Sequence, residues 1–402
     1  MDTIRAGLDW FKAADILIDF GRHGVREGLS HNIRASDGTQ LRANVVRTDC
    51  SGETGGAFML DWLLTGSEDS RRIFENLEDY CFNYMQIKSG LHRGMLRWTE
   101  DSWGACYQDD VARAILPTLL LKNFTDKPDR HFDDALLAVE YLLKTTGTNG
   151  LRVSRTDLPG LTAERMAELH AADNGTTRAH HNGYYAAVLL LCYRVTRRQE
   201  LFDTALNGLT AIMNLYPDNE REQSETEEIC RLILPLAILY EITKSPEHLA
   251  WLTRVTDDLS RLEHPCGGYR EWDTGYKANR SRREDSECSL LTHNGDPVAD
   301  LLYSVNWLPL GFAMAYYATG DEAFRARWNR IARFMALCQT KSENRLTNGS
   351  WARAFDMDRR EIYGVPHDIG WSPCSVESGW TVGEILMGLQ FMRYIDRQCK
   401  IK

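Results

Sequence analysis

The chain has 402 residues, of which 43% are hydrophobic and 26% are charged, so it can bury one large core or two medium ones. Its formal net charge of −10 leaves no basic face for a phosphate backbone, which argues against a nucleic-acid partner. The start of the chain does not look like a signal peptide and no long uninterrupted apolar segment follows, so we expect a reduced, cytoplasmic protein without a membrane span.

One pattern recurs along the chain: an apolar run, a short turn that contains threonine, and then an amphipathic stretch. The runs are apolar on nearly every side, as in a helix buried all round, at residues 112–124, 184–195 and 229–242 among others. The turns lie at residues 64–66, 124–126, 195–197, 242–244 and 318–320. The amphipathic stretches that follow have one apolar face, at residues 71–84, 131–143, 201–215, 248–262 and 323–337. The alternation predicts inner helices, each followed by an outer helix.

A sixth inner helix is expected to begin near Val376, and residues 9–20 would form its outer partner and close the ring. We therefore predict an all-α (α/α)6 toroid, with six inner and six outer helices in one domain over residues 1–402. A helical solenoid is the alternative, but the linkers vary too much in length for uniform repeats. Short strands are expected near residues 29–46 and 268–276.

Long linkers precede the inner helices, and loops of this length at one end of a barrel usually build a site. They lie at residues 90–108, 147–179, 265–297 and 344–373. The helix starts beside them carry unusual chemistry: Glu53, Tyr107 to Asp110, His180 to Asn182, Glu225 to Glu228, Asp296 to Asp300, and Glu377.

A single acid at a helix start is more often a cap, because the helix macrodipole favours it there. A ring of acids that points into one cavity is harder to explain as caps. Mutual repulsion and burial would raise the pKa of some carboxyl groups and leave others ionised, which gives the acid and base that glycosidic cleavage needs. The predicted catalytic residues are Asp109, Asp110, Glu225, Glu228 and Glu377.

Arg113 follows Asp109 by four residues and Arg231 follows Glu227 by four, so each pair can form a buried helical salt bridge. Alternatively, either guanidinium could bind a carboxylate of the substrate. Tryptophans in polar loops favour stacking on sugar rings. The predicted substrate-binding residues are Tyr107, Arg113, His180, His181, Arg231, Trp272, His293, Trp351, Arg353, Trp371 and Trp380.

Other chemistries have little support in the sequence. It contains no glycine-rich nucleotide-binding motif, no Gly-x-Ser-x-Gly and no His-Glu-x-x-His. Zinc bound by Cys230, Cys266 and Cys288 is a weak alternative, and we expect neither a metal nor a cofactor.

Three segments resemble the catalytic (α/α)6 domain of the bacterial glucuronidases of glycoside hydrolase family 154: residues 294–306 (NGDPVADLLYSVN), 348–356 (NGSWARAFD) and 370–386 (GWSPCSVESGWTVGEIL). Separately, residues 107–110 (YQDD) resemble the Trp-x-Asp motif of the unsaturated glucuronyl and rhamnogalacturonyl hydrolases, whose aspartate is the general acid/base. That likeness implies this role for Asp109. The chain departs from the motif by Tyr107 and by a second acid, so Asp110 remains a rival.

Both resemblances imply uronic-acid chemistry, so the predicted function is a glycoside hydrolase acting on uronic-acid-containing oligosaccharides. A sugar epimerase or a polysaccharide lyase is the second hypothesis, because the pair His180 and His181 suits proton abstraction at a sugar carbon. The third is a non-catalytic carbohydrate-binding protein, whose acids would be caps with ordinary pKa values. The sequence leaves open the sugar, the linkage and whether the chain forms a homo-oligomer.

Overall fold

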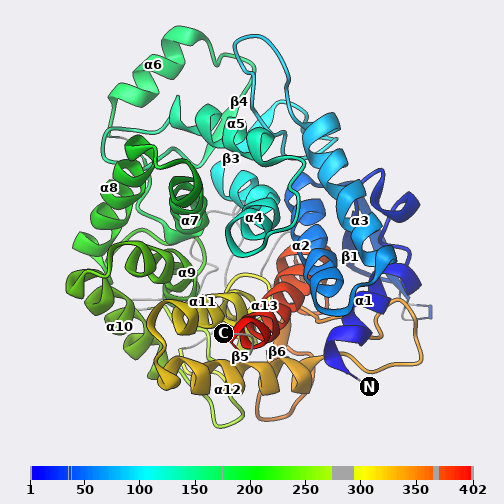
Figure 1. The fold of residues 1–402 in the computed structure, drawn as a ribbon. Helices are drawn as coiled ribbons and strands as arrows, with labels where there is room; N and C mark the ends of the chain where they lie inside the picture. Colours follow the sequence, from blue (N-terminus) through cyan, green and yellow to red (C-terminus); the bar gives the residue numbers. More distant parts are fainter. Residues whose placement is uncertain are drawn as a thin grey trace.

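Six helices form a closed inner ring in the computed structural model, which describes residues 2–399 apart from 35, 38, 174, 274–293 and 365–370. Each inner helix packs on the next, and the last packs on the first (Figure 1). In ring order they are α2 (Thr48–Thr65), α4 (Gln108–Phe124), α7 (Ala179–Thr196), α9 (Glu225–Thr243), α11 (Leu308–Thr319) and α13 (Glu384–Cys399).

Six further helices surround this ring, each against one inner helix. They are α1 (Thr3–Ala13), α3 (Glu68–Asp79), α5 (Phe132–Leu143), α8 (Gln199–Leu215), α10 (Pro246–Ser260) and α12 (Glu322–Cys338). A short helix, α6 (Ala163–Ala171), lies outside both rings. The predicted (α/α)6 toroid is therefore confirmed.

The threonine-containing turns end the inner helices by one repeated device. Each threonine hydroxyl donates to the carbonyl four residues earlier and accepts the backbone N–H two residues later. At four of these ends the next residue is left-handed, with φ of 77° at Gly66, 59° at Arg197, 51° at Lys244 and 68° at Gly320. This turn gives hydrogen-bond donors to carbonyl groups of the last helical turn that would otherwise be unpaired, and it directs the chain into the outer helix.

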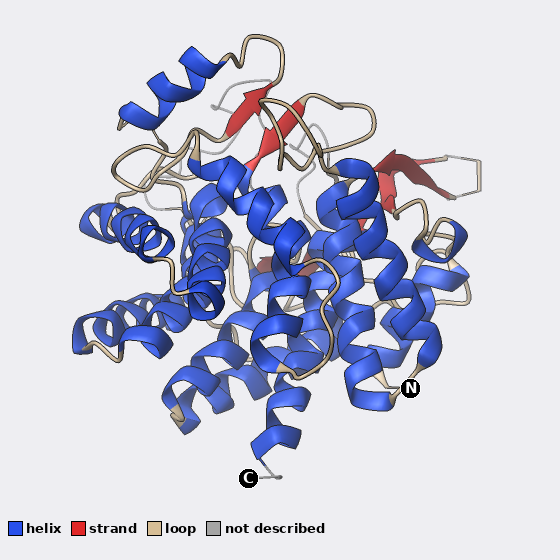
Figure 2. Cartoon of the chain, turned by 45° about the horizontal axis from the view of Figure 1, so that its top comes forward, coloured by secondary structure: helices blue, strands red, loops and turns tan. Residues whose placement is uncertain are grey.

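The strands lie in the long linkers and gather toward one end of the toroid (Figure 2). A three-stranded sheet has the order β2 (Gln40–Val46), β1 (Arg26–Ile33) and β7 (Val376–Glu377). Two antiparallel pairs join β3 (Ala105–Tyr107) with β4 (Arg155–Asp157), and β5 (Val298–Asp300) with β6 (Ala354–Asp356). The strands predicted near residues 29–46 are thus confirmed.

Gly28 makes the central sheet possible. Its φ is +145°, and a Cβ there would lie 2.0 Å from the carbonyl oxygen of Val376. Only glycine lets β1 approach β7 this closely. Because Gly28 pairs with Glu377, this contact fixes where the last inner helix begins.

Several predicted boundaries are wrong. The outer helix predicted at 9–20 is Thr3–Ala13, because Asp15 takes a left-handed φ of 56° that a helix cannot continue. The fifth inner helix does not begin at Asp296 to Asp300, which contain strand β5; it begins at Leu308, after the 3-10 turn η4 (Val305–Trp307). The Asp300 carboxylate accepts the N–H groups of Leu302 and Tyr303, and this local turn competes with a helix.

Two smaller differences concern the first and last inner helices. Glu53 does not open α2, which begins at Thr48. Glu377 precedes a π-helical segment, η5 (Ser378–Gly383), and its side chain caps that segment by accepting the N–H of Thr381. Another π segment, η2 (Tyr80–Met85), extends α3. Of the strand predicted at 268–276, the described part has only a bridge between Tyr269 and Glu263, and residues 274–276 lie outside it.

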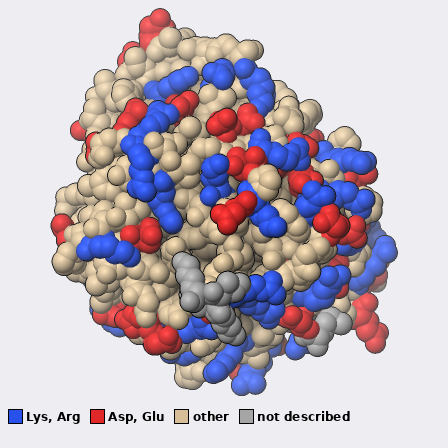
Figure 3. All heavy atoms as spheres, viewed as in Figure 1, with Lys and Arg blue, Asp and Glu red and all other residues tan. Residues whose placement is uncertain are grey.

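The described helices include none with the length and apolar character that a bilayer crossing requires. Figure 3 shows acidic and basic side chains interspersed over the face seen in Figure 1.

Candidate active site

The starts of all six inner helices contribute to one cavity of about 190 Å³. The first turns of α4 and α7 supply lining residues directly, and the segments that lead into α2, α9, α11 and α13 supply the others, so the expected convergence at one end of the ring is observed. The cavity is lined by Arg47, Trp98, Tyr107, Asp109, Asp110, His180, His181, Glu222, Leu302, Tyr303, Trp371, Glu377 and Trp380.

Half of the predicted site residues lie where they were expected. These are Tyr107, Asp109, Asp110, His180, His181, Trp371, Glu377 and Trp380. Their positions agree with the sequence analysis, and their chemical roles stay predictions.

Arg113 and Arg231 do not reach the cavity, so their predicted contact with a substrate carboxylate is wrong. Both are completely buried, and they stack on tryptophan rings beneath it. The Arg113 guanidinium lies 3.7 Å from the Trp380 ring centre, and that of Arg231 lies 3.8 Å from the Trp307 ring centre. The alternative of buried helical salt bridges is confirmed, with 3.2 Å between Arg113 and Asp109 and 3.6 Å between Arg231 and Glu227.

Glu225 and Glu228 also lie outside the cavity lining, which corrects their predicted catalytic role. The Glu228 carboxylate accepts the backbone N–H groups of Ala179 and His180, and so ties the start of α7 to α9. Glu225 lies 4.0 Å from Arg221 on the same helix end. Both acids have structural partners that explain why they are there.

Three more predicted residues are placed elsewhere. Trp351 is completely buried in the core, where its indole N–H donates to the Met335 carbonyl, so it cannot stack on a ligand. Trp272 is half-buried and is not part of the lining. Arg353 is buried behind the wall instead of touching a ligand, while His293 lies outside the described residues.

Arg353 supports two aromatic residues of the cavity wall. Its guanidinium donates to the Trp371 carbonyl at 2.6 Å and lies 4.7 Å from the Tyr303 ring centre. Its Nε bonds the Asp300 carboxylate at 3.2 Å, and Asp300 in turn caps the turn that carries Tyr303. Arg353 therefore positions side chains that line the cavity.

Sequence reasoning missed Arg47, Trp98, Glu222, Leu302 and Tyr303 in the lining, and Asp49 just behind it. A signal existed for four of them. Arg47 and Asp49 stand directly before and within the first turn of the first apolar run, as the acids do at the other helix starts. Leu302 and Tyr303 fall within the segment 294–306 that carries the family resemblance.

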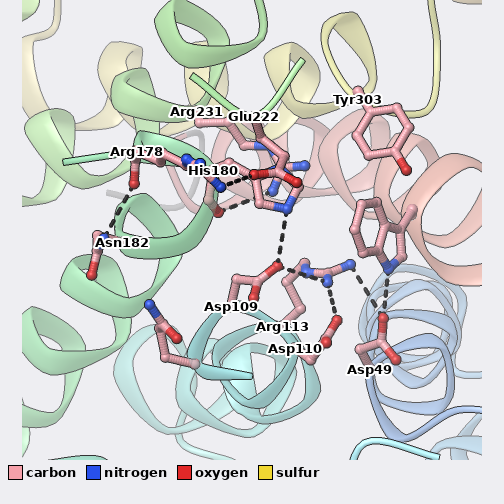
Figure 4. Close-up of polar contacts among 12 residues, drawn as sticks. Asp49, Asp109, Asp110, Arg113, Arg178, His180, Asn182, Glu222, Arg231 and Tyr303 are labelled. Atoms are coloured by element: carbon pink, nitrogen blue, oxygen red, sulfur yellow. Dashed lines mark hydrogen bonds and ion pairs between the residues drawn. The ribbon is translucent and has the colours of Figure 1, made fainter. Parts of the chain in front are cut away.

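Two arginines, Arg47 and Arg113, hold a cluster of acids at one side of the cavity. Figure 4 shows Arg113 with Asp49, Asp109 and Asp110. Arg47 lies 2.7 Å from Asp49 and 3.2 Å from Asp110, and Arg113 lies 3.3 Å from Asp49 and also contacts Asp110. Together the two arginines contact five carboxyl groups: Glu27, Asp49, Glu53, Asp109 and Asp110. Negative charge therefore exceeds positive charge unless some of these groups keep their protons.

The pKa values diverge within this cluster. Burial alone would raise the pKa of Asp49, but the guanidiniums of Arg47 and Arg113 hold it below its ordinary value. Burial, together with the charges of Asp49 and Asp109, raises the pKa of Asp110 well above its usual range. Burial also raises the pKa of Glu377 to about 8. Ionised carboxylates and neutral carboxylic acids thus coexist at neutral pH, which is the requirement for acid–base catalysis.

Two histidines complete the polar side of the cavity. His180 Nδ1 bonds Glu227, and its Nε2 lies 3.5 Å from an oxygen of Asp109. Burial lowers the pKa of both His180 and His181, so both imidazoles are neutral at pH 7. Asp109 Oδ1 and His181 Nδ1 have no hydrogen-bond partner among the described residues. Both are available to a ligand.

Aromatic rings form the remaining walls. Trp98 and Tyr107 pack at 5.0 Å between ring centres, and Tyr303 and Trp380 pack at 5.6 Å. The Trp380 indole N–H donates to Asp49, which locks the ring against the acid cluster. Flat apolar surfaces beside hydrogen-bonding groups match the two faces of a sugar ring.

A metal centre finds no support in the part of the chain that the structure describes, where no three His, Cys, Asp or Glu side chains are grouped to hold an ion. Of the cysteines considered for zinc, Cys230 is buried, Cys266 lies 3.1 Å from His264, and Cys288 is outside the described residues.

No family model and no curated protein matches the sequence. Solved structures share its fold over nearly the whole chain. One is a cellobiose 2-epimerase from Bacillus thermoamylovorans, with 10% identity, coverage of 97% of this chain and 98% of that one, and a TM-score of 0.63. Another is an unsaturated glucuronyl hydrolase specific for heparin, with 11% identity, coverage of 98% and 97%, and a TM-score of 0.60.

A third is an α-1,6-mannanase of Salegentibacter sp., with 12% identity, coverage of 98% of both chains and a TM-score of 0.58. That structure is of an inactive variant in which two consecutive aspartates are replaced by asparagine, in complex with α-1,6-mannotriose. At these identities the comparisons establish the (α/α)6 fold. The resemblance to family 154 stays a prediction.

Proposed function

We propose that the protein is a carbohydrate-active enzyme and, more narrowly, a glycoside hydrolase that acts on oligosaccharides. The structures that share its fold include an epimerase and two glycosidases. The cavity combines aromatic walls with acids of divergent pKa, as glycosidic cleavage requires.

The observation that carries this proposal is the pair Asp109 and Asp110 at the start of α4. Asp110 Oδ1 is held by both Arg47 and Arg113, whereas Asp109 keeps one oxygen without a protein partner among the described residues. In the mannanase with this fold, a variant with two consecutive aspartates changed to asparagine is inactive. We assign the role of general acid to Asp109. Asp110 would act on Asp109 only through its charge.

Glu377 is the opposing carboxyl group in this proposal. It lines the cavity from the start of the last inner helix, where its Oε1 accepts the Cys50 thiol. Hydrolysis needs one group that donates a proton to the glycosidic oxygen and one carboxylate that activates water or attacks the anomeric carbon. Because burial raises the pKa of Glu377 to about 8, we assign the second role to its ionised form, whose population grows as the pH rises toward 8. Among the described residues Asp110 is paired with two arginines, whereas Asp109 is paired with one, Arg113, and Glu377 accepts the Cys50 thiol.

The narrower proposal of a uronic-acid-containing substrate rests on the resemblances in the sequence. Within the described lining, Arg47 is the one arginine, and it already contacts three protein carboxylates, those of Glu27, Asp49 and Asp110. A uronate would have to compete with one of these. A substrate panel should therefore pair each glucuronide with the matching neutral glycoside.

Asp109→Asn and Glu377→Gln, assayed on this panel, test the hydrolase assignment. Each should lower kcat by about 10²-fold or more, since each removes one acid–base group. Glu225→Gln is the matched control, because Glu225 is an acid at a neighbouring helix start outside the cavity. Full activity in both cavity variants would reject the assignment, and hydrolysis of only the neutral glycosides would reject the uronate part alone.

An epimerase or a lyase is the second candidate, favoured by the two neutral histidines in the cavity. His180 and His181 pack at 4.5 Å between ring centres, and a neutral imidazole can take a proton from a sugar carbon. Deuterium from the solvent should then enter a recovered sugar that has not been hydrolysed, and a lyase would release an unsaturated product that absorbs ultraviolet light. Neither signal is expected from a hydrolase.

A non-catalytic binding protein fits less well. That hypothesis predicts caps with ordinary pKa values, whereas burial raises the pKa of Asp110 and of Glu377. It would be favoured by sugar binding without turnover.

A further inference from the structure

We propose that Glu227, His180 and Asp109 form a proton relay that controls the protonation of Asp109. This inference rests on the proposed function, in which Asp109 is the general acid. Three inner helices supply the relay, since Glu227 belongs to α9, His180 to α7 and Asp109 to α4. His180 acts through Asp109 and is thus a positioning residue for it.

The geometry places one imidazole between two carboxyl groups. Glu227 Oε1 hydrogen-bonds His180 Nδ1. His180 Nε2 lies 3.5 Å from Asp109 Oδ2, a contact that Figure 4 shows. The exposed fractions are 0% for Glu227, 5% for His180 and 2% for Asp109, so bulk water has little access to the chain of contacts. On the Oδ2 side of Asp109, proton exchange is therefore directed through the imidazole.

The remaining oxygens of both carboxyl groups are fixed differently. Glu227 Oε2 accepts the backbone N–H of Gln223 at 2.8 Å, so Glu227 cannot turn away from His180. Asp109 Oδ2 also lies 3.2 Å from Arg113. Asp109 Oδ1 has no partner among the described residues, and Asp109 lines the cavity. Oδ2 is thus the oxygen on the relay side and Oδ1 is the one left for a substrate.

The surroundings keep the imidazole neutral. Burial, followed by the charges of Arg231 and His181, lowers the pKa of His180 well below its ordinary value. Burial raises the pKa of Glu227 well above its ordinary value although Arg231, 3.6 Å away, opposes the shift, so Glu227 keeps a proton beside the guanidinium at neutral pH. The charged and titratable groups that face His180 are Asp109 and Arg113 from α4, Arg178 and His181 from its own segment, Glu227, Glu228 and Arg231 from α9, and Tyr303.

A neutral imidazole can carry a proton by exchanging its two tautomers. In the acid step Asp109 gives the proton on Oδ1 to the glycosidic oxygen, and the bond from that oxygen to the anomeric carbon breaks. The proton on His180 Nε2 then moves to Asp109 Oδ2 while the Glu227 proton moves to Nδ1, so the negative charge ends on Glu227. Water adds its hydroxyl to the anomeric carbon and gives its proton to the Glu377 carboxylate. Exchange with solvent water in the cavity then removes that proton from Glu377 and returns one to Asp109, from which the reverse relay restores the proton on Glu227.

Two variants separate proton transfer from packing. His180→Gln keeps a hydrogen-bonding side chain but cannot exchange tautomers, so kcat should fall by about 10²-fold with KM changed by less than about threefold. Glu227→Gln keeps a donor toward Nδ1 but has no proton to pass on. In mixtures of H2O and D2O, kcat of the wild type should depend on the deuterium fraction along a curve, because several protons move together. In Glu227→Gln the plot should become linear.

His181→Gln is the matched control, since it alters the adjacent histidine of the same cavity and leaves the relay intact. Its deuterium plot should stay curved whatever its kcat. A linear wild-type plot, or a curved plot in Glu227→Gln, overturns the relay.

A measurement on the wild type tests the relay without turnover. Nitrogen-15 NMR of labelled histidines, assigned with His180→Gln, should show His180 as a neutral imidazole in both tautomers at pH 7. A cationic His180 overturns the relay even if hydrolysis is found. Failure of the whole glycoside panel removes the proposed function, while the NMR result still decides whether the three residues exchange a proton.

Discussion

Replacing Glu377 with glutamine should stabilise the protein at neutral pH while it removes activity. Glu377 is 1% exposed, and burial raises its pKa from 4.5 to about 8. A carboxyl group with a raised folded-state pKa contributes stability that is fully present below pH 4.5 and is lost as the pH rises toward 8. Glutamine has nearly the same shape and does not ionise, so the variant escapes this loss.

The size of the effect follows from the pKa difference. Each pH unit above the unfolded-state pKa of 4.5 lowers the free energy of unfolding by about 1.4 kcal/mol until the folded-state pKa is reached. At pH 7 the wild type should therefore be about 3 kcal/mol less stable than Glu377→Gln. Unfolding entropy is about 2 cal/mol/K per residue, which for a 402-residue chain makes this about 3–4 °C in Tm. The amide oxygen of glutamine replaces one of the two acceptors that bond the Cys50 thiol and the Thr381 N–H, and the loss of the other bond is a smaller cost than about 3 kcal/mol.

The assay is thermal and denaturant unfolding of the wild type, Glu377→Gln and Glu225→Gln between pH 5 and pH 8. The difference between Glu377→Gln and the wild type should grow steadily with pH and be small at pH 5. Glu225→Gln should follow the wild type, because Glu225 lies outside the cavity and pairs with Arg221 near the surface. A constant difference, or a variant that is less stable than the wild type at pH 8, would refute the account of Glu377.

Three further predictions concern the supports of the site. Arg113→Met should lose about 3–5 kcal/mol of unfolding free energy at pH 7 by denaturant titration, and less near pH 3, because protonated acids no longer need the guanidinium. Arg353→Lys should raise KM by about tenfold with kcat nearly unchanged, since Tyr303 and Trp371 lose their shared anchor. Gly28→Ala should lower Tm by several degrees or abolish soluble expression, since its Cβ would overlap the β7 backbone.

The helical repeat could be predicted because its signals are local. A helix buried on all sides must be apolar all round, and the threonine at its end bonds residues four before and two after it. The start of the fifth inner helix was predicted wrongly for the opposite reason. Whether the Asp300 carboxylate caps a turn or opens a helix depends on strand β6 and Arg353, which lie far along the chain.

The site was only half predictable for the same reason. Asp109 and Arg113 are four residues apart, so their ion pair follows from helical spacing. Arg47 pairs with Asp110 across 63 residues, and no local pattern announces that contact. Loop composition also does not give the direction of a side chain: Trp351 enters the core while Trp371, from the same linker, faces the cavity.

The fold explains why so many acids can share one end of this barrel. Asp49 and Asp110 lie in the first turns of α2 and α4, where the positive end of the helix dipole favours a carboxylate. The dipoles supply only partial charges, so Arg47 and Arg113 are needed as full charges, and the acids that remain uncompensated keep their protons. The residues at the helix starts thus determine which carboxyl groups beside the cavity are ionised and which keep a proton.

The linkers serve a different purpose in this arrangement. Trp98, Tyr303 and Trp371 come from the long segments between helices and form walls without contributing to the charge balance. Changes in these walls should act on ligand binding, whereas changes at the helix starts should act on proton transfer. Because the two functions belong to different parts of the repeat, linkers can change substrate preference while the acid cluster stays intact.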